Sequence, residues 1–358
     1  MIDYLIVGAG LYGATCAREL TDKGYKCLVI DKRKHIGGNC YTENVDGINV
    51  HKYGPHIFHT SDEQVWRYVN SFTEFNNFIY RPKVSYRDRM YSFPINLLTL
   101  HQVYPDVTTP SQAKIQLDIE TSKYKEEPPT NMEEYCLSTI GKDLYEIFIK
   151  GYTHKQWGRS PRELPISIAK RLPVRLDFND NYFNDKYQGI PIGGYTQMIE
   201  RMLEGIEVSL GHDLFYDAAP HHKNMIYTGA VDEFFDYRFG KLEYRSLEFS
   251  QQRLEVEDYQ GNAVINYTDY YVSHTRVTEH KHFEGTQTPY TIITREYPTD
   301  KGDPYYPIND SENNKRYAQY KELMAELPNT HFGGRLAEYK YYNMDQVIKS
   351  ALDFCEKI

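Results

Sequence analysis

Residues 3–13, with the sequence Asp-Tyr-Leu-Ile-Val-Gly-Ala-Gly-Leu-Tyr-Gly, decide the fold of this chain. The apolar run over residues 3–7 predicts a short buried strand, and the pattern after it predicts a helix over residues 11–23. A second apolar run, over residues 25–30, predicts another strand that ends at Asp31. Together these segments form one βαβ unit with a glycine-rich first turn.

The three glycines Gly8, Gly10 and Gly13 follow the G-x-G-x-x-G pattern of dinucleotide-binding turns. Gly8 permits the tight turn, Gly10 lets the backbone approach a pyrophosphate, and Gly13 lets helix and strand pack closely. The helix N-terminus would face the phosphates, and Asp31 is placed to accept a hydrogen bond from a ribose hydroxyl. The complete strand–turn–helix–strand context disfavours the alternative, a glycine-rich turn that binds nothing.

A glycine pair, Gly37-Gly38, follows the second predicted strand and precedes Asn39. It resembles the FAD-binding proteins of the glutathione-reductase and amine-oxidase type, whereas NAD dehydrogenases usually lack such a pair. This resemblance favours FAD over NAD as the ligand of the βαβ unit.

Length and composition set the class of protein. The chain has 358 residues, 40% of them hydrophobic, and a formal net charge of −9. The length predicts two or three domains, and the charge argues against a general nucleic-acid or anionic-membrane surface. Five cysteines without CxxC spacing predict free thiols in a reducing compartment. No leader pattern and no apolar run near the roughly 20 residues of a membrane span are found, so we expect a soluble, cytoplasmic protein.

Turn and cap signals organise the rest of the chain. A hairpin is expected over residues 41–53 with its turn at Asp46-Gly47. Thr60 with Glu63 has the spacing of a capping box at a helix start. Strands that rejoin the nucleotide-binding unit are expected at residues 206–210 and 224–229, and an antiparallel sheet over residues 242–297.

Longer motifs are more specific than the first turn. They are GAGLYGATCAREL from residue 8, KRKHIGGNCYTE from residue 32, HKYGPHIFHT from residue 51, KGYTHKQWGRSPRELP from residue 150, NDNYFNDKYQGIPIGGY from residue 179, FDYRFGKLEYRS from residue 235, GNAVINYTD from residue 261, TRVTEHKHF from residue 275, PYYPIND from residue 304 and FGGRLAEYKYYNMDQVI from residue 332. Together they resemble the bacterial UDP-galactopyranose mutase family over nearly the whole chain.

This resemblance implies an isomerase that interconverts UDP-galactopyranose and UDP-galactofuranose without net redox change. In this family N5 of reduced FAD attacks the sugar's anomeric carbon as UDP departs, and the adduct opens as an iminium before it closes as the smaller ring. The cofactor supplies the difficult chemistry, and the protein supplies binding, orientation and electrostatics. The resemblance further implies a flavin reductant such as NADPH and a homodimer.

The same resemblance implies the catalytic and substrate residues. Arg171 and Arg276 match two diphosphate-facing arginines, where fixed cations would stabilise the departing UDP. His56 matches a histidine in the loop against the reactive face of the flavin, for which we expect positioning rather than proton transfer. Substrate contacts are expected from Phe148 and Tyr152 around uracil, from Tyr182, Tyr306 and Tyr341 at the phosphates, and from Thr153, Trp157 and Asn266 in the substrate motifs. Surface salt bridges and core packing are the ordinary alternatives for these arginines and aromatic residues.

The expected cofactor contacts come from the glycine motifs and from later motifs. They are Gly8, Gly10, Tyr12, Gly13, Asp31, Lys32, Gly38, Asn39, His56, Ile57, Arg335 and Met344. For His59 a structural and a functional role stay equally open, and no metal site is expected, because His56 and His59 have no Cys or carboxylate at ligand spacing. Asn343 stands where relatives often carry aspartate; with Gln346 it should still cap a helix, whereas a role specific to a carboxylate is in doubt.

The sequence therefore predicts an α/β fold with a Rossmann-like FAD-binding domain, a helical insertion and an antiparallel β-sheet domain. We assign residues 1–75, 195–240 and 325–358 to the FAD-binding domain, 98–150 to the helical domain, and 76–97, 151–194 and 241–324 to the sheet and substrate domain. Two other functions compete with the mutase. One is a flavin oxidase or dehydrogenase that consumes a hydride donor, and the other is a nucleotide-sugar-binding protein without catalysis.

Overall fold

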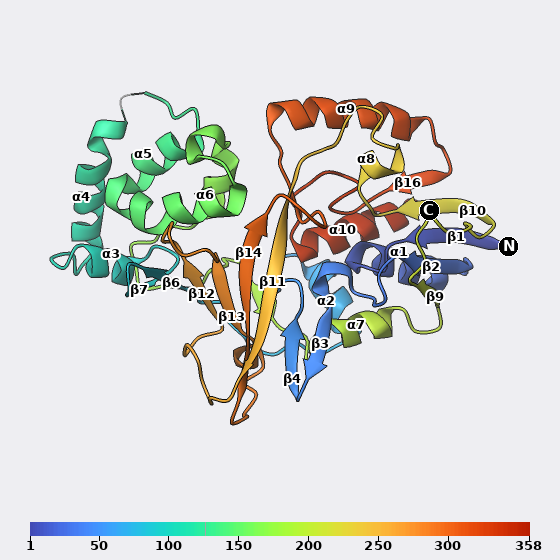
Figure 1. The fold of residues 1–358 in the computed structure, drawn as a ribbon, viewed down its shortest axis with the longest axis horizontal. Coiled ribbons are helices and arrows are strands. Elements are labelled where there is room, and N and C mark those ends of the chain that lie inside the picture. Colours follow the sequence, from blue (N-terminus) through green and yellow to red (C-terminus); the bar gives the residue numbers. More distant parts are fainter. Residues whose placement is uncertain (126) are drawn as a thin grey trace. The chain divides into compact units, whose positions relative to one another are not determined.

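The structure is a computed structural model that describes residues 1–125 and 127–358, without the side chain of Arg171. The chain forms two compact units, whose elements are labelled in Figure 1. The first unit consists of Met1–Phe78, Asp185–Tyr244 and Pro304–Ile358, so it contains both ends of the sequence. The second unit consists of Ile79–Asn184 and Arg245–Asp303.

A five-stranded parallel sheet is the centre of the first unit, with the strand order β16-β10-β1-β2-β9. Its strands are β1 (Ile2–Val7), β2 (Cys27–Asp31), β9 (Glu207–Leu210), β10 (His222–Tyr227) and β16 (Thr330–Phe332). The predicted βαβ unit is confirmed, because α1 (Leu11–Asp22) connects β1 to its parallel neighbour β2. The strands predicted at residues 206–210 and 224–229 are confirmed as β9 and β10 of the same sheet.

The core of this unit joins the sheet to helices α1, α7 (Gly194–Met202) and α10 (Met344–Cys355). Ile6 and Val29 contribute from the sheet, while Leu20, Met198 and Ile348 contribute from the three helices, and all five are fully buried. The unit's other elements are α2 (Glu63–Asn70), α8 (Val231–Phe234), α9 (Ser311–Ala325), β3 (Thr42–Val45), β4 (Ile48–His51), β5 (Phe58–Thr60), β8 (Tyr187–Gly189) and β15 (Tyr306–Pro307).

The predicted hairpin is confirmed as β3 and β4, whose turn residues Asp46 and Gly47 both have positive φ, as a type I′ turn requires. The capping box predicted for Thr60 and Glu63 is wrong. Helix α2 is capped instead by Asp62, whose side chain accepts hydrogen bonds from two backbone N–H groups of the first turn. Thr60 instead ends strand β5, and its hydroxyl accepts from the backbone N–H of Asp62, at 3.1 Å.

In the second unit the strands follow the order β11-β14-β13-β12-β6-β7. They are β6 (Lys83–Tyr86), β7 (Arg89–Ser92), β11 (Tyr244–Leu254), β12 (Val264–Tyr267), β13 (Arg276–Glu279) and β14 (Thr291–Thr299). The predicted antiparallel sheet is confirmed from β11 to β14. The parallel pairing of β12 with β6 was not predicted, because an alternating pattern marks a strand but not the direction of its neighbour.

Helices α3 (Leu97–Val103), α4 (Pro110–Thr121), α5 (Met132–Leu144) and α6 (Gly151–Trp157) belong to the same unit as this sheet. A π-helical segment, Tyr145–Lys150, joins α5 to α6. One apolar core packs these helices on the strands and includes Val84, Leu100, Ile140, Leu144 and Phe148. The division of this unit into a separate helical domain and a sheet domain stays a prediction.

All five cysteines are free thiols, as their spacing predicts, and all five are buried. Within the described residues, every helix is too short or too polar to cross a lipid bilayer.

Candidate functional site

The glycine turn at the end of β1 leaves no room for side chains at two of its glycines. A Cβ on Gly8, whose φ is +112°, would lie 2.0 Å from Oγ1 of Thr228. A Cβ on Gly13 would lie 1.9 Å from the carbonyl oxygen of Gly8. The turn and the helix therefore approach each other at a distance that only glycine permits.

The pair Gly37-Gly38 docks directly on this turn. The backbone N–H of Gly37 donates to the carbonyl oxygen of Ala9 at 2.8 Å. A Cβ on Gly38, whose φ is +54°, would lie 3.1 Å from Cα of Gly10. The two glycine motifs thus meet backbone to backbone, and they form a cradle that a single side chain would fill.

Helix α1 begins at this cradle with its N-terminus uncapped. Its N-cap residue is Gly10, which has no side chain to accept from the first N–H groups, and the first turn carries no acidic residue. Unpaired N–H groups and the positive end of the helix dipole favour a bound anion. The chemistry of this edge therefore suits the pyrophosphate of a dinucleotide.

Asp31 has a structural role beside the predicted one. Its carboxylate accepts from the backbone N–H of Ala9 and from that of Arg33, both at 2.8 Å. A carboxylate offers about four acceptor positions, so others remain for a ribose hydroxyl. Asn39 accepts from Nη1 of Arg33 at 3.0 Å, and Lys32 is exposed beside them. Arg33 therefore contacts both Asp31 and Asn39, and it was not predicted from the sequence.

Tyr12 is buried, and its side chain is directed away from the cradle. Its hydroxyl lies 2.7 Å from Nε2 of His331. A Cβ on Gly333 would lie 2.1 Å from the Tyr12 ring, so the ring supports the Gly333-Gly334 turn. We therefore retain a cofactor contact of Tyr12 only for its backbone.

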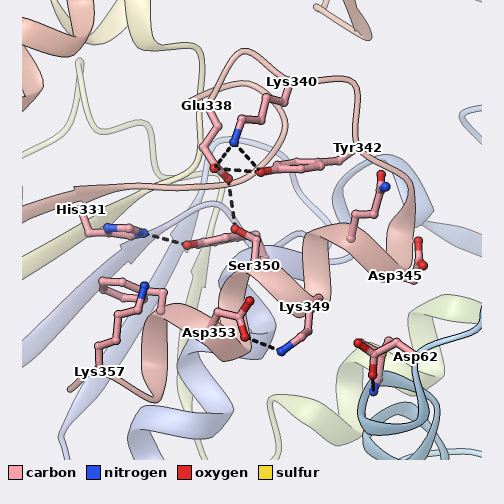
Figure 2. A pocket seen from close by; sticks show the side chains of 14 residues that line it. Asp62, His331, Glu338, Lys340, Tyr342, Asp345, Lys349, Ser350, Asp353 and Lys357 are labelled. Atoms are coloured by element: carbon pink, nitrogen blue, oxygen red, sulfur yellow. Dashed lines mark hydrogen bonds and ion pairs between the residues drawn. The ribbon is translucent and has the colours of Figure 1, made fainter.

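A polar cavity of about 560 Å³ lies along one face of α10 (Figure 2). Its side chains pair among themselves: the Tyr342 hydroxyl donates to Glu338 at 2.9 Å, Lys340 lies 3.1 Å from that hydroxyl, and Lys349 pairs with Asp353. Of the residues predicted to bind the cofactor, Tyr12 is the single one among the described lining residues. The cavity is therefore distinct from the glycine cradle.

The loop after β4 fixes His56 by its backbone and by its ring. Its backbone N–H donates to Nδ1 of His51 at 3.1 Å, and its own Nδ1 lies 2.8 Å from the carbonyl oxygen of Gly54. Because a carbonyl only accepts, this contact requires the proton on Nδ1. The hydroxyl of Tyr195 donates to the His56 carbonyl oxygen at 3.1 Å, and Ile57 is buried. These contacts define one ring orientation, as a positioning role would need.

His59 is anchored to a different segment. Its Nδ1 lies 2.7 Å from Oδ2 of Asp185, whose other carboxylate oxygen accepts from the Ser61 hydroxyl at 2.9 Å. This contact connects β5 to the segment just before β8.

Arg335 organises the aromatic residues predicted near the phosphates. The rings of Tyr306 and Tyr341 stack with centroids 5.2 Å apart, and the Arg335 guanidinium carbon lies 5.9 Å and 5.6 Å from the two centroids. Its Nη2 donates to the carbonyl oxygen of Tyr342 at 2.6 Å. Met344 follows as the first residue of α10, after the N-cap residue Asn343, which confirms the predicted helix start.

In the second unit, Arg276 is the centre of a group that we call the arginine cluster, consisting of Arg276, Tyr152, Asn266 and Glu296. Arg276 Nη2 donates to the Tyr152 hydroxyl at 2.9 Å, and its Nε donates to Oδ1 of Asn266 at 3.3 Å. Burial raises the pKa of Tyr152, so this hydroxyl stays protonated at neutral pH. Three residues predicted from separate motifs are thus joined by hydrogen bonds.

Glu296 was missed in the sequence. It lies on β14 directly opposite Arg276 on β13, with Oε2 3.7 Å from Nη1 of the arginine. Burial raises the pKa of its carboxyl, and Arg276 partly offsets the rise. Its Oε1 is buried without a hydrogen-bond partner among the described residues. The sign of this residue in the sequence was a glutamate in the alternating strand Thr-Ile-Ile-Thr-Arg-Glu-Tyr. A solvent-exposed residue on an edge strand would give the same pattern.

Aromatic rings surround the remaining predicted residues of this unit. Tyr182 packs on Tyr80 with centroids 5.1 Å apart and on Phe93 at 6.1 Å. Phe93 in turn stacks on Phe148, which lies in the π-helical segment. Thr153 is buried in α6, Trp157 packs against the core of the unit, and the Arg171 side chain lies outside the described residues.

Comparisons with known proteins agree with these features. A family model of UDP-galactopyranose mutase matches residues 147–341, and one of an NAD(P)-binding Rossmann-like domain matches residues 6–72. The chain is 42% identical to a dTDP-fucopyranose mutase of Escherichia coli, with 98% of this chain and 96% of the relative covered. It is also 42% identical to a probable UDP-galactopyranose mutase of Klebsiella pneumoniae, with 97% and 92% covered.

Solved structures share the fold. A crystal structure of reduced UDP-galactopyranose mutase has a TM-score of 0.81 at 15% identity, with 99% of this chain and 93% of that chain covered. A putrescine oxidase has a TM-score of 0.62 at 11% identity, with 99% and 98% covered. The chain therefore has a flavoprotein-type α/β fold, as the sequence predicted.

Proposed function

Because the chain belongs to the UDP-galactopyranose mutase family, we propose that it interconverts UDP-galactopyranose and UDP-galactofuranose without net redox change. Membership of this family makes the protein an isomerase. The observation that carries the substrate assignment is the 42% identity to the Klebsiella pneumoniae relative over 97% of this chain. The hydrogen-bonded group of Arg276, Tyr152 and Asn266 supports it, because a diphosphate needs a fixed cation.

The proposed cofactor is FAD in its reduced form, supplied with electrons by a reductant such as NADPH. The cradle between Gly10 and Gly38 and the uncapped start of α1 fit its pyrophosphate. When bound, FAD would supply N5 for a covalent adduct with the anomeric carbon of the sugar. In the proposed site the cofactor contacts come from Gly8, Gly10, Tyr12, Gly13, Asp31, Lys32, Gly38, Asn39, His56, Ile57, Arg335 and Met344.

The chain's own residues would stabilise the departing UDP. Negative charge develops on the diphosphate as its bond to the sugar breaks, and Arg276 and Arg171 would bind it there. Tyr182, Tyr306 and Tyr341 would donate hydroxyl hydrogen bonds to the phosphates. The remaining substrate contacts would come from Phe148, Tyr152, Thr153, Trp157 and Asn266. His56, held by Gly54, would orient the cofactor rather than move a proton.

A second candidate substrate is a dTDP-linked fucose. It is favoured by the 42% identity to the Escherichia coli dTDP-fucopyranose mutase over 98% of this chain. Such a substrate differs from UDP-galactose by a methyl group on the base and by two missing hydroxyl groups. A homodimer and a cytoplasmic location are further parts of the proposal and rest on the resemblance to the family.

Turnover of both nucleotide sugars tests the proposal. Purified protein is incubated with UDP-galactofuranose or dTDP-fucofuranose, with and without dithionite, and the products are separated by chromatography. We expect the purified protein to contain bound flavin. We expect UDP-galactopyranose to form only under reducing conditions. Faster turnover of dTDP-fucofuranose would assign the second substrate. Bound flavin without turnover of either sugar would favour an oxidase, and absence of flavin would contradict the cofactor assignment.

A further inference from the structure

Lys155 lies on α6 between two of the proposed substrate residues, Tyr152 and Trp157. Its ammonium group donates three hydrogen bonds to backbone carbonyl oxygens, of Tyr267 at 2.8 Å, Val272 at 2.8 Å and His274 at 2.9 Å. An ammonium has three N–H donors, so all of them are used. All three acceptors lie within residues 267–275, which comprise the last residue of β12 and the connection to β13, and we call this segment the β12–β13 loop.

The β12–β13 loop connects the two strands that carry Asn266 and Arg276. These residues are register partners at the last pair before the loop opens, and Arg276 Nε donates to Asn266 at 3.3 Å. Two side chains of the loop, Tyr270 and Tyr271, are 58% and 92% exposed. These two side chains contribute little packing, whereas Thr268 and Thr275 of the same segment are buried. Polar contacts therefore add to what holds the shape of the loop.

One face of α6 is fitted to this loop. Gly151, His154 and Lys155 have the i, i+3, i+4 spacing of one helix face. A Cβ on Gly151 would lie 2.3 Å from the carbonyl oxygen of Thr268, so the helix backbone rests directly on the loop. The rings of His154 and Tyr270 meet edge to face with centroids 5.2 Å apart. Lys155 completes this contact with its three bonds.

We propose that Lys155 is a positioning residue of the arginine cluster: it fixes the β12–β13 loop on α6 and so sets Arg276 and Asn266 against Tyr152. The inference rests on the proposed function, because it assumes that this cluster binds the diphosphate. Tyr152 precedes Lys155 by one helical turn, and its hydroxyl accepts from Arg276 Nη2 at 2.9 Å. The loop and the cluster are therefore tied to the same helix.

A second lysine of this unit provides a matched control. Lys281 is buried and donates to the carbonyl oxygens of Glu257 at 2.7 Å and Thr288 at 2.8 Å. It has the same backbone-directed chemistry as Lys155 but holds other loops. Loss of either lysine leaves carbonyl groups unpaired and should destabilise the unit, whereas loss of Lys155 alone should weaken nucleotide binding.

The experiment compares Lys155→Met, Lys155→Arg and Lys281→Met. UDP binding is measured by calorimetry, and stability by urea unfolding. We expect Lys155→Met to weaken UDP binding about tenfold. Lys155→Arg should weaken it as well, because a planar guanidinium cannot serve three carbonyls arranged around one nitrogen. Lys281→Met should lower stability comparably and leave the UDP dissociation constant within about twofold of wild type.

Two results would overturn the inference. One is a wild-type UDP dissociation constant in both Lys155 variants, and the other is an equal weakening by Lys281→Met. If Lys155→Met does not fold, Lys155→Arg alone decides between these outcomes. If the wild-type protein binds no UDP, the proposed function fails, and hydrogen exchange then tests the positioning separately. Exchange of the backbone amides of residues 267–275 should be faster in Lys155→Arg, and unchanged exchange would contradict the role of Lys155.

Discussion

At the scale of single residues, the binding role of Arg276 depends on the side chains around it more than on its charge. Its Nη2 and Nε donate to Tyr152 and Asn266, and Glu296 lies opposite on the next strand. We predict that Arg276→Lys weakens UDP binding at least tenfold, although the charge is kept. A lysine cannot donate in these two directions and to a phosphate together, and hydrogen bonds of charged groups contribute about 1.5–3 kcal/mol each.

Calorimetric titration with UDP measures this effect. The control is Arg253→Lys, a substitution on β11 of the same unit, where the side chain is 41% exposed and pairs with Glu255. This control should bind UDP like wild type. Equal affinity of Arg276→Lys and wild type would show that position 276 acts only through its charge.

At the scale of elements, flavin binding should depend on the close approach between the glycine turn before α1 and the Gly37-Gly38 turn. We predict that Gly38→Ala lowers the flavin content of the purified protein several-fold while its circular dichroism is preserved. The added methyl group would lie 3.1 Å from Cα of Gly10 and would fill the cradle. The ratio of flavin absorbance to protein absorbance measures the loss.

Gly24→Ala separates crowding from backbone strain. Gly24 also has a positive φ, of +90°, but a Cβ there would meet nothing within 4 Å. Its flavin content should therefore equal that of wild type, with a small loss of stability from the strained φ. A matching loss of flavin in both variants would assign the effect to strain instead of the cradle.

At the scale of the whole molecule, stability should depend on pH through Glu279 in the second unit, which is fully buried. Burial raises the pKa of its carboxyl, but the nearby His282 and Thr291 side chains and hydrogen bonds from the backbone N–H groups of Tyr259 and Gln260 outweigh this and lower it to about 2. This pKa lies below the ordinary value of 4.5. Glu279 therefore stabilises the fold fully above that pH, and the contribution is lost as the pH falls toward 2.

His282 contributes with the opposite sign. Its Nε2 lies 3.3 Å from Asp258 and 3.3 Å from Glu279, and the adjacent Glu279 carboxylate raises the pKa of His282 above 6.5. The ion pair is therefore complete below that pH and is lost as the pH rises through the folded-state pKa. Urea unfolding measured across pH should thus show the largest stabilisation from the Glu279–His282 pair between about pH 4.5 and 6.5.

We predict that Glu279→Gln lowers the free energy of unfolding at pH 6 by about 2–3 kcal/mol, since 1 pKa unit corresponds to about 1.4 kcal/mol. The variant should also lose less stability than wild type between pH 6 and pH 3. Glu255→Gln, at a side chain that is 75% exposed, is the control and should change stability little. Parallel pH curves for wild type and Glu279→Gln would contradict this assignment.

The sequence by itself determined the first βαβ unit, its glycine-rich turn and the family. These depend on local rules: Gly8 and Gly13 are required where backbone atoms would meet any Cβ at about 2 Å, and each strand and helix shows its own period. The hairpin at Asp46-Gly47 was predictable for the same reason, because both positions need positive φ. The capping box at Thr60 was not, because the pairing of β5 with β8 extends the strand to that residue.

Only the tertiary structure decided which distant residues act together. Lys155 lies in a motif that gave it no role, and Glu296 lies in none. Each gains its role from partners brought near by sheet register and helix packing. The parallel pairing of β12 with β6 and the direction of the Tyr12 hydroxyl toward His331 have the same origin. A sequence pattern gives the period and the local turn, whereas the free energy of a buried polar group depends on neighbours that are distant in the chain.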